Sequence, residues 1–224
     1  MTVASAAPAA PPVAKACPVK GSIVLAVVLP AVLEVLDGTI VNVALPHMKA
    51  AFGITSDQTI WILTSYILAS VVVMPLTGFF AKRFGRRRLI ITAITGFAVF
   101  SMLCGLAGSI GVMVDCRLGQ GMFGAFLIPL AQSILFDSFL RDKRGQAMAL
   151  FGLGVVIAPI LGPTLGALLT EYFSWRAVFC VNLPIAGFAL FMMAGQLKEE
   201  GGRNRCAATD AGRGRDEGLV RPRR

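Results

Sequence analysis

A short basic segment between two long apolar stretches constrains the fold of this chain more than any other feature. The stretches run from Thr59 to Ala81 and from Leu89 to Ala107, and five cations lie between them: Lys82, Arg83, Arg86, Arg87 and Arg88. A helix needs about 20 mostly apolar residues to cross the hydrocarbon core of a bilayer. The pattern therefore predicts a membrane hairpin whose basic turn faces the cytoplasm, because short loops rich in Lys and Arg stay on that side.

The composition agrees with a membrane protein. The chain is 56% hydrophobic and 15% charged, whereas soluble domains carry about 25% charged residues. The net charge of +9 does not indicate a nucleic-acid partner, because the cations cluster beside apolar stretches, where they set topology or contact lipid headgroups. The chain has one histidine and five scattered cysteines without a Cys-x-x-Cys pair. We therefore predict no metal site, no cofactor and no enzyme active site.

Four more apolar stretches complete a prediction of six membrane helices in one all-α bundle. They cover about residues 22–45, 112–136, 146–169 and 177–197, and residues 46–57 are expected to form an outside loop. Most of the 21 Lys and Arg then fall on the cytoplasmic side, which places both termini there.

The two ends of the chain differ in composition from the apolar part. We expect residues 1–20 to be a disordered tail, 21–197 to be the membrane domain and 198–224 to be a disordered basic tail. The Arg- and Gly-rich end also resembles the translation of a GC-rich gene in the wrong reading frame.

Charged side chains within the apolar stretches are the candidate functional residues. Glu34 and Asp37 are three residues apart and share one face of the first helix. A carboxylate inside a bilayer costs about 2.5 kcal/mol or more, so both acids should face a cavity, where they can exchange a proton or pair with a cationic compound. Arg117 and Gln120 share a face of the fourth helix, and this cation can influence proton release from a facing acid. The alternative is a purely structural role, with Arg117 paired to Asp115 or Asp37.

The fifth apolar stretch is crowded with glycine and proline. Proline bends a helix, and glycine lets another backbone approach closely. Pro159, Gly162, Pro163 and Gly166 could therefore form either a hinge for a moving helix or an ordinary close-packing face. The sequence does not separate the two.

Five motifs together resemble transporters of the major facilitator superfamily, of the EmrB/QacA drug:proton antiporter type. The resemblance covers roughly residues 22–197 and corresponds to the N-terminal half of such a transporter. The motifs are Leu36–Pro46, Gly78–Arg88, Arg117–Gly121, Ala158–Gly166, and Trp175-Arg176 followed by Asn182–Pro184. Two positions depart from the family pattern. Lys82 replaces an acid of the superfamily loop motif, and Ala167 replaces the usual second glycine of the antiporter motif.

The resemblance implies a function. It implies proton-coupled efflux of hydrophobic or cationic drugs across the cytoplasmic membrane, by a bundle built of two three-helix inverted repeats. The partners that it implies are the lipid bilayer, the transported compounds and protons, a periplasmic adaptor protein and an outer-membrane channel. The alternatives are a truncated half that does not transport, or a half that works only as a dimer.

The resemblance also assigns roles to residues. Proton and substrate coupling falls to Asp37, Glu34, Arg117 and Gln120. The antiporter-motif hinge comprises Pro159, Gly162, Pro163 and Gly166. The gating loop comprises Gly78, Lys82, Arg83, Gly85, Arg86 and Arg87.

Overall fold

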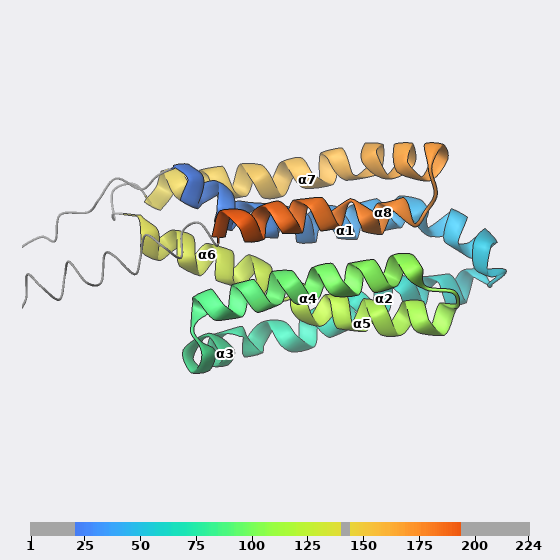
Figure 1. Cartoon of the computed structure of the whole chain (residues 1–224), viewed down its shortest axis with the longest axis horizontal. Helices are drawn as coiled ribbons and strands as arrows, with labels where there is room; N and C mark the ends of the chain where they lie inside the picture. Colours follow the sequence, from blue (N-terminus) through green and yellow to red (C-terminus); the bar gives the residue numbers. More distant parts are fainter. Residues whose placement is uncertain (1–20, 140–143, 194–224) are drawn as a thin grey trace, which may run out of the picture.

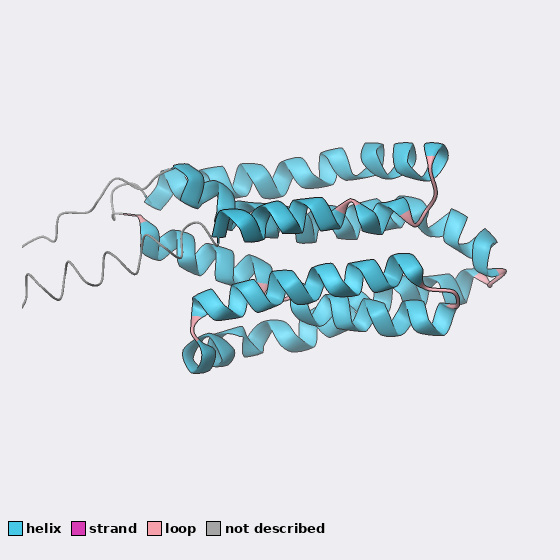
Figure 2. Ribbon diagram, in the orientation of Figure 1, coloured by secondary structure: helices cyan, strands magenta, loops and turns pink. Residues whose placement is uncertain are grey.

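The computed structural model describes residues 21–139 and 144–193, and all regular elements in these ranges are helices (Figures 1 and 2). The predicted tails, 1–20 and 198–224, and residues 194–197 of the predicted membrane domain lie outside the described residues. The elements are α1 (Gly21–Phe52), α2 (Ser56–Val73), η1 (Met74–Leu76), α3 (Thr77–Phe84), α4 (Arg86–Leu106), α5 (Ile110–Gly124), α6 (Leu127–Ser138), α7 (Arg144–Tyr172) and α8 (Ala177–Cys180).

These elements form six rods that run up and down along one long axis (Figure 1). Three rods consist of consecutive pieces: α2, η1 and α3 form one, α5 with α6 forms another, and α8 with the helical segment after it forms the third. A sixth apolar helical segment covers Ala177–Met193, and the other five rods are long and apolar enough to cross a membrane. The all-α prediction of six helices is therefore confirmed in the described residues.

Proline explains where the rods are interrupted. A proline has no amide hydrogen, and its ring clashes with the carbonyl four residues earlier. The interruption at Ala125 and Phe126 lies just before Pro129, and the short 3₁₀ segment η1 contains Pro75. The interruption after Cys180 precedes Pro184 in the same way. In contrast, α1 and α7 each continue through two prolines.

One boundary of the sequence prediction is wrong. The expected outside loop at residues 46–57 is mostly helical, because α1 continues through Pro46 to Phe52 and α2 begins at Ser56. The first two cations of the basic segment, Lys82 and Arg83, belong to α3. Gly78 lies inside α3, and the chain reverses at Gly85, whose φ of +83° is a left-handed value that favours glycine.

The helices bury two apolar clusters, one toward each end of the bundle. The cluster nearer the start of α1 includes Leu33, Phe97 and Leu127, and the other includes Ile40, Met113 and Phe179 among others. α1 packs mainly against α7, while α5 packs against both α2 and α4. Several helices carry a polar residue at the position where the chain passes from one cluster to the other. The bundle therefore contains a polar layer between two apolar ones.

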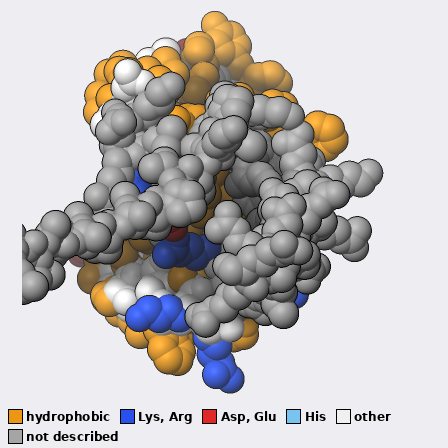
Figure 3. Space-filling model, turned by 90° about the vertical axis from the view of Figure 1, so that its left-hand side faces the viewer, with side chains coloured by type: hydrophobic (Ala, Val, Ile, Leu, Met, Phe, Trp, Pro, Cys, Tyr) orange, Lys and Arg blue, Asp and Glu red, His pale blue; other side chains and the backbone are white. Residues whose placement is uncertain are grey.

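The ends of the bundle agree with an alternating topology. The start of α1, the turn at Gly85, the end of α6 and the start of α7 lie at the same end, on the left of Figure 1. A view onto this end shows Lys and Arg side chains in its lower part (Figure 3). The cations of the basic segment therefore lie at the end from which the first helix starts.

Candidate functional site: a buried polar layer

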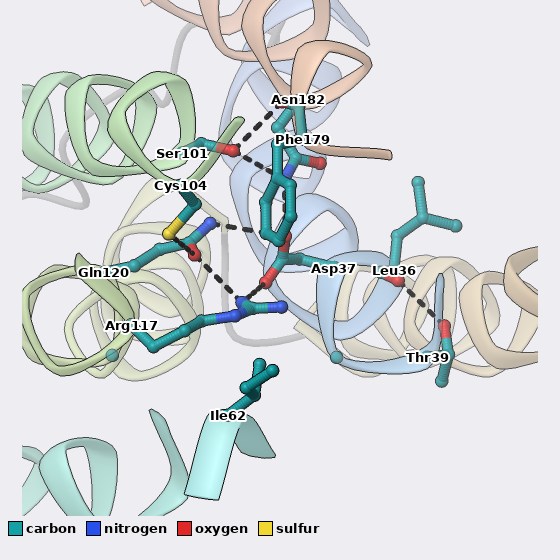
Figure 4. A network of polar contacts seen from close by, with 12 residues as sticks. Leu36, Asp37, Thr39, Ile62, Ser101, Cys104, Arg117, Gln120, Phe179 and Asn182 are labelled. Atoms are coloured by element: carbon teal, nitrogen blue, oxygen red, sulfur yellow. Dashed lines mark hydrogen bonds and ion pairs between the residues drawn. The ribbon is translucent and has the colours of Figure 1, made fainter. Parts of the chain in front are cut away.

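Asp37 of α1 lies at the centre of the polar layer and is fully buried. Its Oδ2 accepts a hydrogen bond from Nη1 of Arg117 at 2.7 Å, which is also an ion pair. Its Oδ1 accepts hydrogen bonds from Nε2 of Gln120 at 3.2 Å and from the side-chain amide of Asn182. Figure 4 shows these donors converging on one carboxylate from α5 and from the helical segment after α8. Both oxygens of Asp37 are thus occupied.

Gln120 and Asn182 connect Asp37 to further side chains. Oε1 of Gln120 accepts from Nη1 of Arg117 at 2.9 Å, so one amide holds both members of the ion pair. The Asn182 amide also donates to Oγ of Ser101 at 3.0 Å, and Ser101 in turn donates to the carbonyl of Phe179 at 3.0 Å (Figure 4). Four helical rods therefore meet in one hydrogen-bonded network.

Aromatic rings flank the guanidinium of Arg117. Its Cζ lies 4.9 Å from the ring centroid of Phe179 and 5.4 Å from that of Tyr66. A cation over an aromatic face is attracted by the negative charge density of the ring. Phe179 and Tyr66 come from different rods, α8 and α2, so the rings hold the cation from two directions.

The layer also contains polar atoms without a partner among the described residues. They are Nε and Nη2 of Arg117, Oδ1 of Asn182, Oη of Tyr66 and Oε2 of Glu34. An unsatisfied buried polar group costs about 1–3 kcal/mol, and a charged group costs more. The layer thus has unused hydrogen-bonding capacity in the middle of the bundle, which water, a proton or a polar ligand group could satisfy.

Three of the four predicted coupling residues belong to the hydrogen-bonded network, and the fourth, Glu34, lies outside it. Asp37, Arg117 and Gln120 are in direct contact, so the structure pairs Arg117 with Asp37, which is one of the two partners left open by the sequence. The other candidate partner, Asp115, is exposed. Glu34 is buried one turn from Asp37 but is not hydrogen-bonded to the network.

The predicted gating loop is a structured corner. Lys82 and Arg83 are exposed at the end of α3, and Arg86 begins α4 directly after Gly85. Arg86 forms an ion pair with Asp137 near the end of α6. This contact joins the third and fourth rods at the end that carries the basic segment.

Two glycines of the predicted hinge are the contact points of α7 with α1. A Cβ added at Gly162 would overlap the Thr39 side chain, and one added at Gly166 would lie 3.0 Å from the carbonyl oxygen of Ile40. The helix α7 continues through Pro159 and Pro163 without interruption. The close-packing interpretation is therefore visible in the contacts, and a hinge remains a prediction.

Sequence reasoning did not identify several members of the layer. The sequence shows Asn182 only as part of a motif and gives no role to Ser101 and Phe179. It favours a place in an interfacial aromatic belt for Tyr66, whereas the structure places its ring beside Arg117 and buries its hydroxyl. An asparagine and a serine in otherwise apolar helices are weak signals, although polar residues inside a membrane span indicate packing or function. Within the described residues, no three His, Cys, Asp or Glu side chains gather into a metal-binding group.

Comparison with known proteins identifies similar sequences. The sequence profile of the Major Facilitator Superfamily matches residues 27–212. The chain is 41% identical over 172 residues to the fatty acid resistance protein FarB of Neisseria gonorrhoeae, covering 75% of this chain and 34% of FarB. It is 37% identical over 169 residues to the multidrug export protein EmrB of Escherichia coli K12, covering 75% and 33% of the two chains. The chain thus spans about a third of the length of these curated relatives.

Solved transporter structures share the fold. A crystal structure of a D-xylose–proton symporter aligns with a TM-score of 0.67 at 17% identity, covering 78% of this chain and 47% of the symporter. A bacterial homologue of the human lysosomal transporter Spinster, in an inward-facing and unoccupied conformation, aligns with a TM-score of 0.63 at 20% identity. That alignment covers 77% of this chain and 42% of the homologue.

Proposed function

The chain belongs to the Major Facilitator Superfamily, and we propose that it provides the N-terminal bundle of a proton-coupled exporter of hydrophobic and cationic compounds. One observation carries the proposal: the buried Asp37–Arg117 ion pair, which joins the first and fourth rods in the middle of the bundle. Intramembrane charges are functional by default, because a membrane protein retains them against a considerable energetic cost. The substrate class is supported by the relatives named for multidrug export and fatty acid resistance.

In this proposal a proton and the ion pair compete for Asp37. A proton on the carboxylate removes the charge that holds Arg117, so the contact between α1 and α5 weakens. The contacts of Gln120 change as well, because Gln120 is hydrogen-bonded to both members of the pair. Removing one partner from a buried pair typically costs about 3–5 kcal/mol, which is enough to change the relative populations of two conformations. The energy of proton entry can thus be used to rearrange helices.

Transport by alternating access needs a second bundle that moves against this one. The exposed apolar surfaces of α7 and of the second rod favour such a partner. Only 17% of the most apolar 18-residue stretch of α7, and 28% of that of the second rod, is buried in this bundle. We propose that the partner is either a further part of a longer protein or a second copy of this chain. Without either, the bundle would bind protons but would not transport.

The proposal includes an orientation and a set of partners. We place residues 21–197 in the cytoplasmic membrane with both termini in the cytoplasm, because the basic corner at Gly85 lies at the same end as the start of α1. By analogy with EmrB-type exporters, we also propose a periplasmic adaptor and an outer-membrane channel as partners.

Dye efflux from cells that lack their own pumps tests this function. Cells that express the chain should expel a lipophilic cationic dye such as ethidium, and a protonophore should stop this efflux. Asp37→Asn should abolish efflux at unchanged membrane expression. The matched control is Asp115→Asn, which neutralises an exposed acid of the same protein and should leave efflux intact.

Two results would contradict parts of the proposal. Full efflux by Asp37→Asn would remove the role of the ion pair. Efflux that a protonophore does not affect would exclude proton coupling. If the chain causes no efflux alone, co-expression with the part of EmrB that this chain does not match separates an incomplete pump from a wrong function.

A further inference from the structure

Ser101 of α4 bridges the interruption in the sixth rod. α8 ends at Cys180, because Pro184 cannot donate to the carbonyl of that residue. Before the interruption, Ser101 donates to the carbonyl of Phe179 at 3.0 Å, and after it, Oγ of Ser101 accepts from Nδ2 of Asn182 at 3.0 Å (Figure 4). Ser101 and Asn182 are fully buried. One hydroxyl of a neighbouring rod therefore joins the two parts of the sixth rod.

The two ends of this series of hydrogen bonds fix the direction of every bond in it. A backbone carbonyl and a carboxylate can only accept. The hydroxyl hydrogen of Ser101 therefore points to Phe179, and Oγ of Ser101 is the acceptor toward Asn182. The amide of Asn182 also donates to Oδ1 of Asp37. The charged form of Asp37 thus determines which way the Asn182 amide is turned.

This orientation leaves the oxygen of the Asn182 amide unused. Its Oδ1 is buried and has no hydrogen-bond partner among the described residues, which lowers the stability of this arrangement. A half-turn of the amide would exchange Oδ1 with Nδ2. While Asp37 is a carboxylate the half-turn is unfavourable, because it brings two acceptor oxygens together. When Asp37 carries a proton the half-turn is favourable, because the carboxylic acid can donate to Oδ1.

We propose that Asn182 is a positioning residue that links the proton on Asp37 to the sixth rod by a half-turn of its side-chain amide. A proton from water binds Oδ1 of Asp37, the amide turns, and its oxygen accepts from the carboxylic acid. The same oxygen accepts from Ser101, whose hydroxyl leaves the carbonyl of Phe179. Release of the proton from Oδ1 of Asp37 to water reverses these changes, so the O–H bond of the acid is the one covalent bond that forms and breaks.

The half-turn changes how firmly the sixth rod is held. With Asp37 charged, Ser101 is bonded on both sides of the interruption. With Asp37 neutral, the bond to Phe179 is lost, so the two parts of the rod are joined less firmly. The ring of Phe179 also lies 4.9 Å from Cζ of Arg117, so a change at this residue reaches both members of the ion pair. The role in transport rests on the proposed function, whereas the half-turn can be measured without transport.

Ser101 and Asn182 are neutral, so they change the hydrogen bonds of Asp37 without exchanging protons themselves. The charged and titratable groups around Asp37 come from four helices: Glu34 on α1, Tyr66 on α2, Cys104 on α4 and Arg117 on α5. α6 and α7 carry their charged residues only near the ends of the bundle.

Nuclear magnetic resonance of the asparagine side chains tests the half-turn. The chain has three asparagines, Asn42, Asn182 and Asn204, so asparagine labelled isotopically at Cγ and Nδ2 gives few signals from the purified chain in lipid nanodiscs. Asn182→Gln identifies the relevant ones. On acidification the Cγ signal of Asn182 should move downfield, because Oδ1 becomes hydrogen-bonded, and its Nδ2 protons should move upfield, because they lose the carboxylate. Asn42 donates to the carbonyl of Gly38 at 2.9 Å and is the internal control, whose signals should not move.

Asp37→Asn makes the same test at constant pH. Arg117 can only donate, so the oxygen of the new amide must face Arg117, and its NH2 group takes the place of Oδ1. That group donates toward Asn182, so this variant should show both shifts at neutral pH. An unmoved Cγ signal of Asn182 in the folded variant would overturn the proposal. If the variant does not fold, the wild type decides: a Cγ signal that stays in place down to the pH of unfolding would overturn it.

Dye efflux measured against pH tests the use of Ser101 in transport. Ser101→Ala removes two hydrogen bonds from the charged arrangement and one from the neutral arrangement, so it should move the pH profile of efflux upward by about 0.4–1 pH unit. Ser70→Ala is the matched control, because it removes a similar bond, to the carbonyl of Gly121 at 3.1 Å, and should leave the profile in place.

The two experiments separate the half-turn from the proposed function. Equal pH profiles for Ser101→Ala and Ser70→Ala would overturn the role of Ser101. If no variant and no wild type causes efflux, the proposed function is wrong, while the asparagine signals still decide whether the amide turns. If the wild type exports dye and Asp37→Asn does not, but the Cγ signal of Asn182 never moves, the function stands and the half-turn is wrong.

Discussion

The contact between α1 and α7 allows a prediction with an internal reference. Gly162 faces Thr39 so closely that a Cβ added there would overlap the Thr39 side chain, with 2.8 Å to its Cβ. Thr39 cannot easily move away, because its hydroxyl donates to the carbonyls of Leu36 at 2.9 Å and Val35 at 3.2 Å. Gly152 lies on the same helix, and an added Cβ there meets nothing within 4 Å. The same substitution to alanine should therefore have opposite effects at these two glycines.

The expected magnitude follows from two terms. Replacing a helical glycine by alanine stabilises the helix by about 0.5–1 kcal/mol, and this term applies to both sites. Overpacking a tight contact costs about 1–3 kcal/mol, and this term applies only to Gly162→Ala. The helix term cancels when the two variants are compared, so they should differ by about 1–3 kcal/mol. For a chain of this size, that corresponds to roughly 2–12 °C in Tm.

Thermal unfolding of the purified variants, followed by circular dichroism in one detergent at one heating rate, measures this difference. Gly162→Ala should melt below the wild type and Gly152→Ala at or above it. Thr39→Ala removes the hydroxyl that the new methyl group would meet. Combining it with Gly162→Ala should recover part of the loss, with a coupling energy of at least about 0.5 kcal/mol. Equal Tm values for the two glycine variants, or strictly additive effects, would refute the packing argument.

Three further predictions concern charged residues. Arg117→Leu leaves the buried Asp37 carboxylate without its cation and should lower stability by about 3–5 kcal/mol in the same melting assay, and an unchanged Tm would argue against a buried pair. Arg86→Gln breaks the ion pair with Asp137, but the two side chains are 48% and 59% exposed. The loss should therefore be below about 1 kcal/mol and should vanish in high salt. In a variant whose five natural cysteines are replaced by serine, Lys82→Cys should react with a membrane-impermeant maleimide in inside-out vesicles, and reaction in intact cells would reverse the proposed orientation.

The number and order of the helices could be predicted from sequence because each rod is a long apolar run between charged or glycine-rich connections. Boundaries were less predictable because tertiary packing extends some helices. Met48 lies beyond Pro46 yet is fully buried in the second apolar cluster, which stabilises the additional turns of α1. The sequence also does not show which of its prolines interrupt a helix. Pro129 coincides with an interruption, whereas α7 continues through Pro159.

The polar layer was only partly predictable for a related reason. Charges stand out in an apolar helix, so the sequence identifies Asp37 and Arg117. The structure shows which of its two possible partners Arg117 binds, namely Asp37. Small neutral side chains such as Ser101 and Asn182 cost much less to bury and therefore give a weaker signal. Their contacts join residues 81 positions apart, and such a pairing depends on how the helices pack.

The wide sequence separation within the polar layer has a consequence for biosynthesis. Asp37 is made early, but its donor Arg117 follows 80 residues later and Asn182 follows 145 residues later. At about 5–20 residues per second, the ribosome needs on the order of ten seconds to supply the last donor. During this interval the first helix must reside in the membrane, or at its surface, with unpaired carboxylates that oppose insertion. The order of synthesis therefore leaves the contacts of Asp37 incomplete until the last helix, which carries Asn182, has been made.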